Sequence, residues 1–133
     1  MKVKICGLSN AKHVKTCVDL RVNYCGFILN YPKSHRFIKF EKAKELTSIK
    51  KKNTKYVGVL VNPKNEELEK FSKLNLDYFQ IYGDYNKKSI YNIKTKFKQK
   101  IIIAIQVKHK KDILKYKQYE KLADIILWDS SGL

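Results

Sequence analysis

Two residues near opposite ends of the 133-residue chain, Cys6 and Asp129, are of types that transfer protons. Cys6 ends the strand-like segment Val3-Lys4-Ile5-Cys6 and is followed by Gly7, and Asp129 follows the apolar pair Leu127-Trp128. In α/β proteins the reactive side chains stand at the carboxyl ends of parallel strands. A thiolate can serve as a base and a protonated carboxyl group as an acid. We therefore predict that the two side chains face one substrate-sized gap as an acid–base pair.

Their sequence neighbours suit these two tasks. Side chains alternate between the faces of a strand, so Lys4 shares a face with Cys6 and its charge favours the thiolate. Ile125 and Leu127 share the face of Asp129, and apolar surroundings favour the protonated form of a carboxyl group. The plainer alternative is a buried structural cysteine and an aspartate that caps a helix.

Strand-like and helix-like segments alternate along the whole chain. The expected strands are 3–6, 24–29, 56–61, 78–83, 101–107 and 123–129, and the expected helices are 10–20, 40–51, 65–74, 86–99 and 110–122. Such alternation predicts parallel strands joined by right-handed crossovers in one α/β domain. A flavodoxin-like or Rossmann sheet would also satisfy it, but residues 6–11 do not form the phosphate-binding glycine loop such a sheet requires. A β/α barrel is therefore preferred.

The net charge of +17 raises the alternative of a basic nucleic-acid-binding module. Of the 29 basic residues only Arg21 and Arg36 are arginines, although arginine is the residue that best recognises bases and phosphates. The lysines are spread over nearly every expected helix and do not form one stripe. We expect a solvated lysine surface and no nucleic-acid partner.

Other classes lack their sequence signals. No apolar run approaches the roughly 20 residues of a membrane span, and the start lacks the apolar core of a secretory signal, so we expect a cytoplasmic protein without membrane contact. The cysteines and histidines match no metal or disulfide spacing. They are Cys6, Cys17, Cys25, His13, His35 and His109. We expect no metal site and no cofactor.

Six segments, taken in order, carry a resemblance that covers essentially the whole chain. They are Val3-Lys4-Ile5-Cys6-Gly7-Leu8, Gly26-Phe27-Ile28 with Pro32-Lys33-Ser34-His35-Arg36, Glu41-Lys42-Ala43, Val57-Gly58-Val59-Leu60-Val61-Asn62-Pro63, Gln80-Ile81-Tyr82-Gly83-Asp84 and Leu127-Trp128-Asp129-Ser130. Together they resemble phosphoribosylanthranilate isomerase, the TIM-barrel enzyme of tryptophan biosynthesis. Each segment alone is a weak signal, but six in register are a strong one.

The resemblance implies a reaction and a role for each site residue. The reaction is an Amadori rearrangement of N-(5-phosphoribosyl)anthranilate to an open-chain ketose phosphate, with Cys6 as the base and Asp129 as the acid. Arg36 would hold the anthranilate carboxylate through bidentate contacts, although it could be a plain surface arginine. Tyr82 stands where the family usually has histidine, and it can donate a hydrogen bond but not shuttle protons near neutral pH. Lys4 completes the predicted site.

Length is the main departure from the family. A complete (β/α)8 barrel takes about 250 residues, so we expect residues 1–133 to form an incomplete barrel of six parallel strands and five helices. Strands 7 and 8, whose loops bind the substrate phosphate in the family, would be missing. The chain would resemble the amino-terminal three-quarters of the enzyme, ending at Ser131-Gly132-Leu133 without a closing helix.

Two consequences are expected from this shortened barrel. Turnover should be weak or absent because the loops that bind the substrate phosphate are missing. The open sheet edges should promote self-association. A related barrel enzyme that acts on another phosphorylated sugar remains an alternative function.

Overall fold

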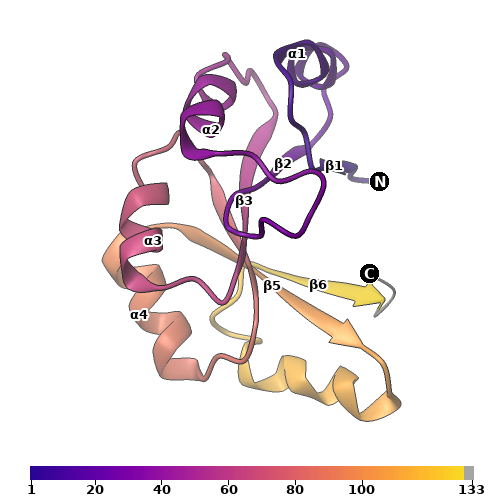
Figure 1. Cartoon of the computed structure of the whole chain (residues 1–133). Coiled ribbons are helices and arrows are strands. Elements are labelled where there is room, and N and C mark those ends of the chain that lie inside the picture. Colours follow the sequence, from indigo (N-terminus) through magenta and orange to yellow (C-terminus); the bar gives the residue numbers. More distant parts are fainter. Residues whose placement is uncertain (131–133) are drawn as a thin grey trace.

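The computed structural model describes residues 1–130, which alternate between strand and helix from end to end (Figure 1). The strands are β1 (Lys4–Cys6), β2 (Tyr24–Ile28), β3 (Lys55–Val61), β4 (Tyr78–Tyr82), β5 (Lys100–Val107) and β6 (Ile125–Ser130). The helices are α1 (Ala11–Asp19), α2 (Phe40–Thr47), α3 (Asn65–Phe71), α4 (Lys87–Phe97) and the 3₁₀ helix η1 (Lys110–Gln118). The expectation about Ser131-Gly132-Leu133 lies outside the described residues.

All six strands are parallel and follow one another in the sheet in the order β1-β2-β3-β4-β5-β6. This sequential order, with the sheet curled and the helices outside it, is the architecture of a TIM barrel, and it confirms the predicted fold class. Within residues 1–130, β1 and β6 each pair with one neighbour only. The sheet is therefore an open half-barrel whose two edge strands lie on the side away from α3 and α4 (Figure 1).

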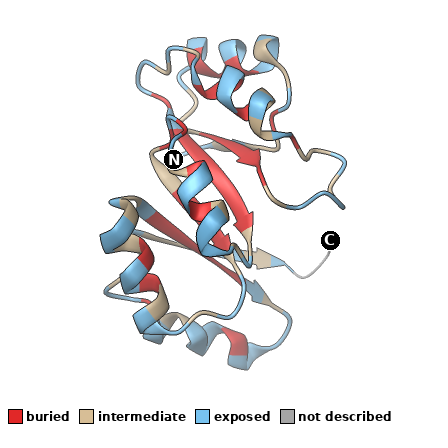
Figure 2. Cartoon of the chain, turned by 60° about the vertical axis from the view of Figure 1, so that its left-hand side comes forward, coloured by how far each residue is buried: buried red, intermediate tan, exposed pale blue. Residues whose placement is uncertain are grey.

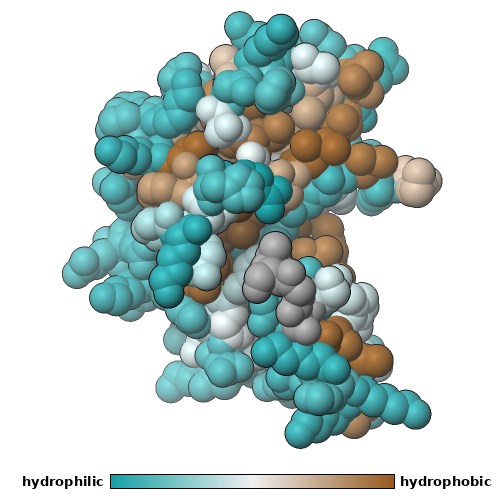
Figure 3. Space-filling model, turned by 45° about the vertical axis from the view of Figure 1, so that its right-hand side comes forward, coloured by the Kyte–Doolittle hydropathy of each residue, from teal (hydrophilic) through white to brown (hydrophobic). Residues whose placement is uncertain are grey.

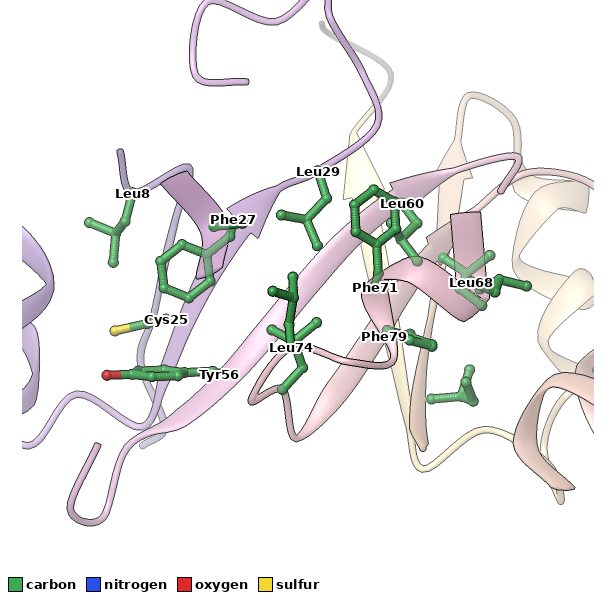
Figure 4. Packing of buried hydrophobic residues seen from close by; sticks show 14 of the residues in the cluster. Leu8, Cys25, Phe27, Leu29, Tyr56, Leu60, Leu68, Phe71, Leu74 and Phe79 are labelled. Atoms are coloured by element: carbon green, nitrogen blue, oxygen red, sulfur yellow. The ribbon is translucent and has the colours of Figure 1, made fainter. Parts of the chain in front are cut away.

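The core lies between the sheet and the helices. Buried residues run along the strands and along the helix sides that face them (Figure 2). Phe27, Tyr56 and Phe79 point from neighbouring strands into this layer, which also contains Leu68 and Phe71 of α3 (Figure 4). Burying a side chain of this size stabilises the fold by about 1.5–3 kcal/mol. The continuous apolar run of β3 therefore reflects a strand that is covered on both faces.

The last helix differs from the expectation. Residues 110–118 form a 3₁₀ helix, whereas the sequence predicted an α-helix over 110–122. Its apolar residues Ile113 and Leu114 are adjacent and exposed, and Tyr116 packs against the core and against Trp128, so the segment lacks the apolar stripe of an amphipathic α-helix. Asp112 instead holds its start by accepting hydrogen bonds at Oδ2 from the main-chain N–H groups of Lys108 and His109, both at 2.9 Å.

The other elements agree with the sequence to within a few residues at their ends. The largest difference is α2, which ends at Thr47 rather than near residue 51. Cys17 and Cys25 are buried in the core. Among the described residues, no helix combines the length and the apolar character that crossing a membrane requires.

Candidate active site

The strand register places the predicted site residues on one face of the sheet. Cys6 is in register with Gly26 of β2, and Asp129 with Gln106 of β5. Following the register across β3 and β4 shows that Tyr82 shares this face with both. This is the concave, inner face, because the residues that alternate with them pack under the helices. Cys6, Tyr82 and Asp129 thus lie at the carboxyl ends of β1, β4 and β6.

Tyr82 and Asp129 are in direct contact. The Tyr82 hydroxyl donates a hydrogen bond to Oδ2 of Asp129 at 3.0 Å, although 47 positions separate them in sequence. The Tyr82 hydroxyl also accepts a hydrogen bond from Nε2 of Gln80 at 3.3 Å. Three side chains from two strands therefore form one polar chain on the inner face.

The environment keeps Tyr82 protonated. Burial raises the pKa of its phenol first, and the neighbouring Asp129 carboxylate and Cys6 raise it further, since each opposes a second negative charge. Tyr82 therefore acts as a hydrogen-bond donor near neutral pH. Tyr82 thus contacts Asp129 directly and shares the inner face with Cys6.

Arg36 lies against the end of β1. Its Nη1 donates a hydrogen bond to the main-chain oxygen of Cys6 at 3.0 Å. Gly7 makes this approach possible, because it adopts φ +80° and a Cβ there would lie 2.6 Å from Cδ of Arg36. Nε of Arg36 is buried without a hydrogen-bond partner in the described part of the chain. The arginine thus lies beside Cys6, with Nε buried against Gly7.

Gly26 makes room for Cys6 and Lys4. A Cβ at Gly26 would lie 3.0 Å from Sγ of Cys6 and 3.3 Å from Cε of Lys4, so both side chains pass over the glycine. Lys4 lies on the same face as Cys6 and precedes it in β1, with Ile5 between them on the opposite face. Within residues 1–130 its ammonium group has no carboxylate partner. Its charge is therefore not neutralised by an ion pair there.

Sequence reasoning overlooked Gln80 and Gly26. The signal for Gln80 was a polar residue in the middle of the apolar strand β4, where only 1% of its surface is exposed. Gly26 gave no such signal, because its role depends on which residue β1 places opposite it. No group of three potential metal ligands occurs within residues 1–130.

The chain is similar to known proteins over nearly its whole length. The family model of N-(5'-phosphoribosyl)anthranilate (PRA) isomerase matches residues 3–132. The N-(5'-phosphoribosyl)anthranilate isomerase of Streptococcus mutans is 37% identical over 130 residues, which is 97% of this chain and 62% of that protein. The Thermoanaerobacter pseudethanolicus isomerase is 39% identical over 121 residues, covering 90% of this chain and 57% of that relative.

Solved structures show the same relationship. Phosphoribosyl anthranilate isomerase from Thermotoga maritima superimposes with a TM-score of 0.88 at 28% identity, over 100% of this chain and 63% of that one. A second structure of a phosphoribosyl anthranilate isomerase contains reduced 1-(o-carboxyphenylamino)-1-deoxyribulose 5-phosphate, and it superimposes with a TM-score of 0.86 at 28% identity, over 99% of this chain and 66% of that one.

Sequential parallel strands with polar groups at their carboxyl ends define the class of βα-barrel enzymes. Within that class, the chain belongs to the N-(5'-phosphoribosyl)anthranilate isomerase family. It spans 62% and 57% of the length of the two curated relatives described above.

Proposed function

We propose that this chain contains the acid–base centre of a phosphoribosylanthranilate isomerase, a cytoplasmic enzyme of tryptophan biosynthesis. The observation that supports the proposal best is the contact of Tyr82 with Asp129 on the face that also bears Cys6, in a chain matched to the family over residues 3–132. A relative of known structure binds a reduced form of the rearranged product. The substrate of this chain would be the corresponding phosphorylated N-glycoside.

The proposed reaction is a proton relay within one substrate. Asp129 gives a proton to the ribose ring oxygen, the bond between that oxygen and C1 breaks, and the anthranilate nitrogen forms an iminium with C1. The Cys6 thiolate then removes the proton from C2, and the electron pair of that C–H bond neutralises the iminium to give an enolamine. Tautomerisation of the enolamine to the ketose completes an isomerisation without net loss of atoms or electrons.

The surrounding residues would orient the substrate. Arg36 binds the anthranilate carboxylate through guanidinium N–H groups that its contact with Cys6 does not use. Lys4 favours the thiolate of Cys6 because it places a positive charge on the same strand face. Tyr82 holds one oxygen of Asp129, so the other oxygen can exchange the proton.

A fluorescence assay with phosphoribosylanthranilate tests the function. We expect weak turnover, since the described sheet has six strands rather than the eight of a closed barrel. Cys6→Ser and Asp129→Asn should each reduce that turnover at least about a hundredfold and leave substrate binding nearly unchanged. Equal turnover in the parent chain and both variants would contradict the assignment of the two groups.

We also propose that the open edges promote self-association. The edge strands leave main-chain N–H and C=O groups unpaired, and 40% of Val3, 39% of Ile5 and 47% of Trp128 are exposed. Apolar surface reaches the solvent on this side of the molecule (Figure 3). Sedimentation should show mass that rises with concentration, and Val3→Lys should reduce the effect. A monomer boundary at every concentration would contradict this proposal.

A further inference from the structure

Gln80 is a polar residue at a place where the fold has no structural need for one. It lies in the middle of β4 between the buried residues Phe79 and Ile81, and 1% of its surface is exposed. Its register neighbours on the inner face, Val59 of β3 and Ile102 of β5, are both apolar and buried. Burying an amide among apolar side chains costs free energy unless the amide makes hydrogen bonds. The Gln80 amide makes one hydrogen bond, to the Tyr82 hydroxyl, which in turn contacts the proposed acid Asp129.

That hydrogen bond determines where the Tyr82 proton points. Nε2 of Gln80 lies 3.3 Å from the Tyr82 hydroxyl oxygen and donates to it. A phenol has one proton to donate, and with the amide N–H at its lone pair that proton is directed to Oδ2 of Asp129, 3.0 Å away. If the amide were turned over, Oε1 of Gln80 would compete for the proton and draw it away from Asp129.

The amide orientation leaves one atom unsatisfied. Oε1 of Gln80 is buried and has no hydrogen-bond partner within residues 1–130. Turning the amide over would pair this oxygen with the Tyr82 proton, but it would leave Nε2 without a partner and take the proton from Asp129. The observed orientation therefore keeps the chain from Gln80 through Tyr82 to Asp129 intact.

We propose that Gln80 is a positioning residue that acts through Tyr82 on Asp129. Its amide directs the Tyr82 proton to Oδ2 and so leaves Oδ1, which has no hydrogen-bond partner in residues 1–130, as the oxygen that exchanges a proton with the substrate. The catalytic consequence rests on the proposed isomerase function, whereas the direction of the hydrogen bond does not. The two parts can therefore be tested separately.

Proton NMR of the whole chain tests the direction of the hydrogen bond. The Tyr82 hydroxyl proton should give a downfield, slowly exchanging signal, which is assigned because Tyr82→Phe removes it, with a nuclear Overhauser contact to the Gln80 amide protons. Gln80→Met keeps the length of the side chain but removes the donor, and it should speed exchange of the proton at least about tenfold. Gln106→Met is the matched control, since Gln106 lies beside Asp129 on the same face and should leave the signal unchanged.

Each NMR result has a definite meaning. Apart from the assignment by Tyr82→Phe, the contact in the parent chain needs no variant, so it shows whether the Tyr82 proton lies beside the Gln80 amide even if Gln80→Met fails to fold. A Tyr82 proton that exchanges too fast to be seen in the parent chain, or an unchanged signal in a folded Gln80→Met, would overturn the proposal.

Kinetics test the catalytic part. Gln80→Met should reduce turnover about as much as Tyr82→Phe with little change in KM, and the double variant should fall no further than the single ones, since both act on the same carboxylate. Additive losses would overturn the positioning role. Suppose that Gln80→Met speeds exchange of the Tyr82 proton but neither the parent chain nor any variant shows isomerase activity. The proposed function then fails, whereas the direction of the hydrogen bond stands.

Discussion

Arg36 and Cys6 are joined by a hydrogen bond from the guanidinium Nη1 to the main-chain oxygen of the cysteine, 3.0 Å long. The group proposed to bind the substrate carboxylate is thereby tied to the strand that bears the proposed base. Gly7 lies beneath the arginine in the left-handed backbone region, with φ +80°. A displacement of the turn at Gly7 would consequently move both groups together.

The Gly7→Ala substitution should therefore impair both stability and binding. The new Cβ would lie 2.6 Å from Cδ of Arg36, and alanine is strained at this φ, so we expect a loss of about 1–3 kcal/mol in the free energy of unfolding. Displacement of the guanidinium should also raise KM for phosphoribosylanthranilate more than it lowers kcat. Denaturant unfolding and the fluorescence assay measure the two effects.

A matched control is Ser9→Ala, which replaces an exposed residue close to the same turn. It should change the unfolding free energy by no more than about 0.5 kcal/mol. If Gly7→Ala behaves like this control, the close approach of Arg36 to the turn is not a constraint on the protein.

Lys4→Met should alter the pH dependence of turnover. The substitution removes the positive charge on the face of Cys6, so the thiolate is less favoured and the acid limb of the rate profile should move to higher pH. Lys2→Met is the control, because it removes the same charge from an exposed residue that precedes β1. Profiles that coincide for the parent chain and Lys4→Met would remove Lys4 from the mechanism.

Tyr56 should make the fold sensitive to alkali. Burial, followed by the nearby Cys25 and Asp77, raises the pKa of its phenol to about 12, above the value of about 10 in an unfolded chain. Because the folded-state pKa is the higher one, this contribution to stability is complete below pH 10 and is lost as the pH rises toward 12. Up to about 2–3 kcal/mol should be lost over that range, since Tyr56 is fully buried.

Tyr56→Phe tests this origin of the alkaline loss. At neutral pH the variant should be less stable by about 1 kcal/mol, because the Tyr56 hydroxyl donates a 2.8 Å hydrogen bond to the main-chain oxygen of Ile49. Between pH 10 and 12 its free energy of unfolding should fall less steeply than that of the parent chain. Parallel curves over that range, measured by urea unfolding, would assign the alkaline loss to other groups.

Local patterns were sufficient to predict much of this molecule. The buried run 56–61 and the helical spacing of Val14, Cys17 and Val18 report short-range structure, so the strands and the first four helices could be read directly from the residues. The helix predicted over 110–122 was the exception. There the spacing of the apolar residues was too poor to specify an α-helix, and Asp112 stabilises a 3₁₀ helix.

The position of Cys6 and Asp129 at strand ends also followed from the chain alone, because the carboxyl end of a strand is defined by its own residues. The bond between Tyr82 and Asp129 did not, since β5 lies between their two strands and the bond depends on the register and curl of all three. The same holds for Gln80 beneath Tyr82 and for Gly26 beneath Cys6. Strand identity is a short-range property, whereas register and curvature arise from packing across the whole sheet.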